Sequence, residues 1–345
     1  MSDQPPQVQQ AHPKPTEHQP PPLVHVAPAP HLAQRALTTR RMMIYVLVGL
    51  APVIAMALYV FRWYALKQLG ICVASCVAAE IIFTAMRRRP VSVGNFSAAV
   101  TGVILGLSIP GVAPWYVGVV GGFAAIGLGK AVFGGLGQNI FNPAMVGRAF
   151  VTFAFTGAMA AGGYVIQDRK QAAVEVVTRA TPLTALKEKG TVTNLGDLFI
   201  GTTNGSLGET SAIACIVGGL FLCAVRAASW RISAGMLLSA AAIAGLINLA
   251  DPQAEWSALH HLFGGALLFG AFFIATDPVS SPLTHKGQLI FGLGIGALVM
   301  LMRKLSNYPE GVMFAVLIMN AVVPLINEWT IPRPVGGPAP KKERG

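Results

Sequence analysis

Long apolar runs separated by short polar breaks dominate the chain from Met42 onward. A run of about 20 apolar residues is long enough to cross the hydrocarbon core of a bilayer as a helix. The pattern predicts ten such helices: Met42–Phe61, Leu69–Met86, Phe96–Ile109, Trp115–Phe133, Pro143–Val165, Ser211–Ala227, Ile232–Leu249, Leu259–Thr276, Gln288–Met302 and Pro309–Asn327. We therefore predict an all-α polytopic membrane protein with ten transmembrane helices.

The polar stretches divide this chain into five parts. Residues 1–38 are rich in Pro, Gln and His, and we expect a disordered cytoplasmic tail because few large apolar side chains are available for a core. Two groups of five helices follow, at 39–165 and 211–330, with a polar loop at 166–210 between them. Residues 331–345 are predicted to form a second cytoplasmic tail.

Composition and charge support a membrane location. The 345 residues are 53% hydrophobic and 11% charged, whereas a soluble domain carries about 25% charged residues. The net charge of +11 comes from basic residues at the ends of apolar runs, such as Arg40–Arg41 and Arg87–Arg89. This pattern indicates cytoplasmic termini and an external 166–210 loop, and it argues against a nucleic-acid partner. Arg303 and Lys304 are exceptions, because counting the predicted helices from a cytoplasmic N-terminus places these two residues on the outer side of the membrane.

The breaks between the helices recur in the two halves of the chain. Pro110 and Pro143 are 33 residues apart, and Pro278 and Pro309 are 31 residues apart, with an apolar run inside each interval. Two halves of five helices have opposite orientations in the membrane, as in the inverted repeats of many transport proteins. The pattern predicts two inverted five-helix repeats.

Ionisable residues within or beside the apolar runs are candidates for an ion path, because such groups are costly at membrane depth. Glu80 lies well inside the second run, Asp277 ends the eighth, and Glu310 lies in the first turn of the tenth. Arg148, in the fifth run, is a candidate partner for these carboxylates. A structural hydrogen bond is the alternative role for Glu80.

The breaks and the cysteines contain the candidate ligands for cofactors and metals. Asn142 and Glu209 lie in glycine-rich breaks, where they can bind a polar ligand or simply cap helices; Ser206 and Glu209 have capping-box spacing. Cys72 and Cys76 are one helical turn apart. Two thiols alone make a poor metal site, so we predict buried thiols and no metal.

Thr181-Pro182 is predicted to start a short helix that runs to about Lys189, with Thr181 as the N-cap. The Thr181 hydroxyl would then lie at the positive end of the helix, where a phosphate is stabilised. Arg179 adds a cation that can pair with phosphate. A helix cap without further function is the alternative.

Six motifs occur in order over about residues 40–330: Gly94–Ser97, Gly129–Ala144, Ala180–Leu183, Gly205–Ser211, Thr276–Val279 and Tyr308–Met313. Together they resemble the D subunit of the Rnf electron-transport complex (RnfD) and its relative, the B subunit of the sodium-pumping NADH:quinone reductase.

The resemblance implies FMN attached by a phosphoester to Thr181, on the periplasmic face of a bacterial cytoplasmic membrane. It also implies a second, non-covalent flavin, riboflavin or FMN. Thr178-Arg179 departs from the family, which usually has a small acidic or hydroxyl residue followed by glycine there.

The resemblance further implies electron transfer between ferredoxin and NAD, coupled to sodium or proton translocation. Iron–sulfur and NAD-binding subunits, a second FMN-bearing subunit and a flavin transferase would be the partners. The quinone reductase component is the alternative within the family. A channel or secondary transporter without a redox role is the alternative of another class.

Overall fold

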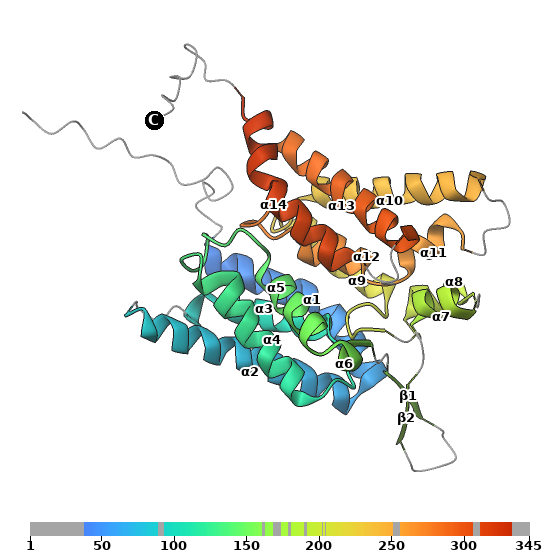
Figure 1. Ribbon diagram of the computed structural model, residues 1–345, viewed down its shortest axis with the longest axis horizontal. Coiled ribbons are helices and arrows are strands. Elements are labelled where there is room, and N and C mark those ends of the chain that lie inside the picture. The colour runs from blue at the N-terminus through green and yellow to red at the C-terminus, as the bar shows by residue number, and fades with distance from the viewer. Residues whose placement is uncertain are drawn as a thin grey trace, which may run out of the picture. The chain divides into compact units, whose positions relative to one another are not determined.

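Helices make up most of the part of the chain that the computed structural model describes (Figure 1). The described residues are 38–88, 93–160, 163–167, 174–178, 181–189, 192–201, 203, 205–250, 256–305 and 311–332. Two predicted site residues, Arg179 and Glu310, fall outside these ranges, as does most of the predicted tail at 1–38.

The first five predicted segments are helical in the structure. They form α1 (Thr39–Phe61), α2 (Trp63–Met86), α3 (Ser97–Leu107), α4 (Trp115–Ile126) with its π-helical continuation η2 (Gly127–Ala131), and α5 (Pro143–Ala154). A 3-10 turn, η1 (Val93–Asn95), precedes α3, and the short α6 (Thr156–Ala160) follows α5. The fifth helix was predicted to reach Val165, but Phe155 leaves the helical conformation at φ −133° and Val165 lies in a strand.

The loop between the two groups contains a hairpin that the sequence pattern did not predict. Strand β1 (Gly163–Gln167) pairs antiparallel with β2 (Val174–Thr178), with Val165 opposite Val176. Two short helices follow, α7 (Pro182–Lys189) and α8 (Leu195–Ile200). The loop is therefore ordered around its own secondary structure in the described ranges.

The second group of predicted segments is helical as well. It comprises α9 (Ala212–Ala224), α10 (Trp230–Ala250), α11 (Ala258–Phe263), α12 (Leu267–Phe269) with the π-helical η3 (Gly270–Ile274), α13 (His285–Leu305) and α14 (Val312–Thr330). The eighth predicted segment is not continuous. It breaks between α11 and α12, where Gly265 has φ +72°, a conformation that glycine adopts readily.

Five of the described helices, α1, α2, α10, α13 and α14, have 19 to 24 residues and are apolar enough to cross a membrane. Shorter apolar helices are α3, α4 with η2, and α9. The prediction of a helical, multi-pass membrane protein is therefore confirmed.

The helices pack in a similar order within each group. In the first group, α2 packs against α3 and α4, and α4 packs against α5. In the second group, α10 packs against α11 and α13, and α13 packs against α14. Contacts of α1 with α9 and of α5 with α14 join the groups. Glycine permits the close packing of α13 on α10, because a Cβ atom on Gly292 would collide with the backbone of Ile232.

Arg303 stabilises the break in the eighth segment. Its guanidinium donates hydrogen bonds to the carbonyl oxygens of His261 (2.5 Å) and Gly264 (2.8 Å), at the end of α11. Arg303 is buried, whereas Lys304 is exposed. Arg303 therefore satisfies backbone carbonyl groups inside the protein, which explains why it need not follow the predicted charge pattern.

Replacing Arg303 with Met should destabilise the protein by about 2 kcal/mol or more, because two carbonyl oxygens at the break lose their donors. The measurement is a heat challenge of the purified protein in detergent, followed by fluorescence-detected gel filtration. Lys304→Met is the matched control and should leave the midpoint unchanged. Equal losses from both variants would contradict a structural role specific to Arg303.

Candidate functional site

A buried ion pair joins the second and fourth predicted helices. Glu80 lies on α2 and Lys130 lies in the π-helical turn η2, and the Lys130 Nζ to Glu80 Oε2 distance is 2.7 Å. The two side chains are 4% and 5% exposed, respectively. Because removing one partner would leave a buried charge uncompensated, each residue supplies the counter-charge that the other requires.

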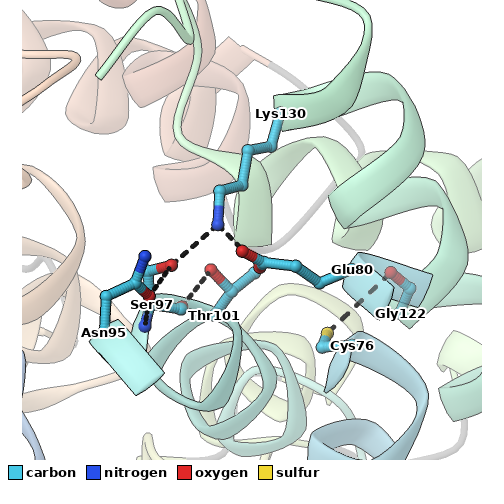
Figure 2. A network of polar contacts seen from close by, with 7 residues as sticks. All are labelled: Cys76, Glu80, Asn95, Ser97, Thr101, Gly122 and Lys130. Atoms are coloured by element: carbon cyan, nitrogen blue, oxygen red, sulfur yellow. Dashed lines mark hydrogen bonds and ion pairs between the residues drawn. The ribbon is translucent and has the colours of Figure 1, made fainter. Parts of the chain in front are cut away.

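Ser97, at the start of α3, is the second acceptor for Lys130. Lys130 Nζ donates to Ser97 Oγ at 2.7 Å, and Ser97 Oγ donates onward to Asn95 Oδ1 at 2.7 Å (Figure 2). Asn95 Oδ1 also accepts from the backbone N–H of Ser97, and Thr101 Oγ1 donates to the Ser97 carbonyl. The Ser97 hydroxyl proton is thus directed to Asn95, and a lone pair remains for the ammonium.

Two cavities meet at Lys130. The larger, about 280 Å³, is lined by Glu80, Phe83, Thr84, Arg87, Asn95, Ile126, Lys130, Ala131, Gly134, Gly135 and Leu136. The smaller, about 70 Å³, lies next to Ser97, Lys130, Asn142 and Asp277, among other residues. Lys130 lines both, so two of the predicted ion-path carboxylates, Glu80 and Asp277, border cavities that share this lysine.

Cys76 lies one turn before Glu80 on α2. It is buried, and its thiol donates to the carbonyl oxygen of Gly122 at 3.8 Å (Figure 2). Cys72 is also buried, and both thiols are free. Within the described residues, no group of three or more His, Cys, Asp or Glu side chains could hold a metal. Both cysteines occupy the buried positions that the sequence predicted.

A second buried ion pair links α5 to the segment before α9. Arg148 on α5 pairs with Glu209, with an Nη2 to Oε1 distance of 3.3 Å and side chains 9% and 6% exposed. Arg148 was a candidate partner for the ion-path carboxylates, but Glu80 pairs with Lys130 and Arg148 pairs with Glu209. The sequence pattern did not single out Lys130 as an intramembrane charge, although it lies inside the fourth predicted helix.

The predicted capping box at Ser206 and Glu209 is wrong. The helix starts later, at Ala212, and its N-cap is Ser211, whose Oγ accepts from the N–H of Ala214 at 3.3 Å. The 206–209 segment is instead a turn that docks on the end of α3. There the Gly208 N–H donates to the carbonyl oxygen of Leu107 at 2.7 Å.

Asn142 is the N-cap of α5 and joins it to the second group of helices. Its Oδ1 accepts from the N–H groups of Ala144 and Met145, and its Nδ2 donates to the carbonyl oxygen of Ile274 at 3.1 Å. Its own backbone N–H donates to Asn320 Oδ1 at 3.1 Å. Asn142 therefore has a structural role in addition to lining the smaller cavity.

Asp277 and Asn320 complete this contact between the groups. Asn320, in the middle of α14, donates to the carbonyl oxygen of Ser280 at 2.9 Å. Ser280 Oγ in turn donates to Asp277 Oδ2 at 2.8 Å. Sequence reasoning missed Asn320, although a lone amide in the middle of the last apolar run is itself an indication of a buried polar contact.

Thr181 caps α7 as predicted, with Pro182 as the first residue of that helix. Thr181 Oγ1 accepts from the N–H of Thr184 at 3.3 Å and lies 2.9 Å from Thr184 Oγ1. The Thr181 side chain is half-buried. Its hydroxyl is therefore fixed at a helix N-terminus, the position predicted from the Thr-Pro sequence.

Comparison with known proteins identifies the family. The sequence profile of the NQR2, RnfD, RnfE family matches residues 25–336, most of the chain. The chain belongs to this family. Within it, the D subunit of the Na(+)-translocating ferredoxin:NAD(+) oxidoreductase complex of Acetobacterium woodii is 40% identical over 322 residues, covering 92% of this chain and 97% of the relative.

Two further members of the NQR2, RnfD, RnfE family show similar agreement. The D subunit of the ion-translocating oxidoreductase complex of Stutzerimonas stutzeri is 40% identical, over 86% of this chain and 92% of the relative. The D subunit of the proton-translocating ferredoxin:NAD(+) oxidoreductase complex of Clostridium ljungdahlii is 37% identical, over 83% and 88%. The resemblance carried by the six motifs is confirmed.

In this family member, Arg148→Met and Glu209→Gln should each destabilise the protein. For Arg148→Met the loss should be about 3 kcal/mol, because the buried Glu209 carboxylate loses its counter-charge. The double variant should lose less than the sum of the two, because neither charge is left alone. The midpoints of the wild type, the two single variants and the double variant in the same heat challenge form a double-mutant cycle, which measures the interaction between the two side chains. Strictly additive losses would show that the two side chains do not stabilise each other.

Proposed function

We propose that the chain is the membrane-embedded D subunit of an Rnf-type, ion-translocating electron-transport complex and that it carries FMN on Thr181. Family membership over most of the chain and the names of the relatives support the complex. The position of the Thr181 hydroxyl is the observation that supports the flavin.

The residues at Thr181 fit a phosphoester. A half-buried hydroxyl at the start of α7 can be reached by a modifying enzyme, and a phosphate there lies at the positive end of the helix dipole. Bound FMN would supply one- and two-electron redox chemistry. The protein would hold the flavin in place, and Arg179 would add a positive charge two residues before the anchor.

A second, non-covalent flavin, riboflavin or FMN, belongs to this proposal. Asn142 and Glu209 are the further candidate cofactor contacts, without assignment to one of the two flavins. Both side chains already make internal contacts, to Ile274 and Arg148 respectively. A flavin would therefore use their remaining hydrogen-bonding capacity or the neighbouring backbone.

The ion path is proposed to involve Glu80, Asp277 and Glu310, with sodium or protons as the coupling ion. Of these three residues, Glu80 and Asp277 are described by the structure, and both border cavities, which supports their selection. The relatives in Acetobacterium woodii and Clostridium ljungdahlii are named for sodium and proton translocation, respectively.

All ten helical segments are proposed to lie in a bacterial cytoplasmic membrane as two inverted repeats. The packing of α2 on α4 is matched by that of α10 on α13, and α4 on α5 is matched by α13 on α14. The cross-contacts α1 with α9 and α5 with α14 join helices at equivalent positions of the two groups. Both termini would be cytoplasmic and the 166–210 loop periplasmic.

Iron–sulfur and NAD-binding subunits, a second FMN-bearing subunit and a maturing flavin transferase are the proposed partners. The family description also includes NQR2, so a role like that of the B subunit in a sodium-translocating NADH:quinone reductase is the alternative. A non-redox channel or transporter would carry no flavin.

Mass spectrometry of the chain, purified from its complex after expression with its flavin transferase, tests the anchor. The wild type should carry one covalent FMN, and Thr181→Ala should carry none, because the acceptor oxygen is gone. Thr184→Ala is the matched control, since its hydroxyl lies 2.9 Å from that of Thr181. It should retain the flavin.

Three results would contradict the proposed anchor: an unlabelled wild type, a labelled Thr181→Ala variant, or loss of flavin only in Thr184→Ala. Arg179→Ala tests the proposed phosphate contact. It should reduce the labelled fraction without moving the label from Thr181.

A further inference from the structure

The Lys130 ammonium lies where oxygen ligands surround a small positive charge. Glu80 Oε2 and Ser97 Oγ are each 2.7 Å from Nζ, and Asn95 Oδ1 is hydrogen-bonded to the same serine. Carboxylate, hydroxyl and amide oxygens are hard ligands of the kind that bind sodium ions. The ammonium thus occupies a position at which a dehydrated cation could be coordinated.

The larger cavity lies beside the ion pair and provides space through which a cation can reach Glu80. It is about 280 Å³ in volume and is lined by both members of the ion pair. Arg87 also lines it, but its guanidinium is exposed and donates to the carbonyl oxygen of Ala131 at 2.7 Å. Solvent and salt screen the charge of Arg87 much more strongly than those of the buried pair. Once the ammonium has left Glu80, a cation inside the cavity is therefore attracted mainly by that carboxylate.

Lys130 is placed so that it can leave Glu80. Its side chain is a flexible chain of four methylene groups that ends in a compact ammonium group. It projects from the π-helical turn η2, a distortion often found at functional sites. Lys130 also lines the smaller cavity, which Asp277 borders. We expect the ammonium to turn into that cavity, on the side of a second carboxyl group, when it leaves Glu80.

Charge balance links the departure of Lys130 to the arrival of another cation. A buried carboxylate without a counter-charge is strongly disfavoured. When the ammonium leaves, a sodium ion or a proton that takes its place on Glu80 restores the charge balance. When the ammonium returns, it displaces that cation.

We propose that Glu80, Ser97 and Asn95 form a binding site for one small monovalent cation and that Lys130 is a tethered competitor for this site. The cation and the ammonium alternate on Glu80, so release of the cation does not leave the carboxylate uncompensated. The proposal rests on the proposed ion-translocating function, because it assigns an ion site and its gate within that path.

Cation-dependent stability of the intact complex tests the site without any redox turnover. Variants with a tagged chain are heated in sodium, lithium or choline chloride at constant ionic strength, each at two pH values, and are then analysed by fluorescence-detected gel filtration. In the wild type the ammonium fills the site, so the midpoint should hardly depend on the cation. In Lys130→Met, Glu80 needs another cation, and about 100 mM sodium should raise the midpoint by at least about 3 °C over choline.

The double variant Glu80→Gln/Lys130→Met is the matched control. It has no buried charge at the site, so it should be more stable than Lys130→Met in choline and should not respond to sodium. Stabilisation of Lys130→Met by sodium or lithium supports a metal cation. Stabilisation by lower pH alone supports a proton as the occupant.

A Lys130→Met variant whose midpoint depends on neither the cation nor pH would overturn the proposal. An equal response in the double variant would also overturn it. Because the measurement does not use the flavin, loss of the Thr181 anchor and loss of this cation site give separate results.

Discussion

The structure depends on one constraint: charges and backbone polar groups inside a membrane must find partners within the protein. The buried pairs Lys130–Glu80 and Arg148–Glu209 follow from it, as do the hydrogen bonds of Arg303 to two carbonyl oxygens. Each of these contacts lies at a break or distortion of an apolar helix, or joins such a helix to a loop. The polar residues therefore supply partners for the charges and backbone polar groups at these breaks and distortions. The same irregular backbone makes internal cavities possible.

The contact between the two groups of helices follows the same logic. Asn142 caps α5 with its side-chain oxygen and donates from its side-chain nitrogen to Ile274, at the end of η3. Asn320 accepts from the backbone of Asn142 and donates to Ser280. Two amides thus satisfy groups that helix ends leave unpaired, and they hold together segments 132 and 178 residues apart.

The sequence predicted the features that local chemistry determines. Run length located the helices, and Thr181-Pro182 located both the start of α7 and its cap. Pairing between distant residues could not be predicted, because Glu80 and Lys130 are 50 residues apart and nothing in either run specifies the partner. The end of α5 at Ala154 and the break at Gly265 were missed because both lie in stretches apolar enough to continue as helix.

Helix α5 contacts both the cavity beside Lys130 and the end of the loop that contains Thr181. Its N-cap Asn142 and its first residues, Pro143 and Ala144, border the smaller cavity. Arg148, further along the helix, holds Glu209 near the end of the 166–210 loop. Coupling between an electron carrier at Thr181 and a cation at Glu80 requires a structural element with two alternative positions. The occupancy of each site must change the equilibrium between these two positions. A shift of α5 would change the Glu209 contact and the cavity beside Lys130 together, so the two buried ion pairs would respond to one movement.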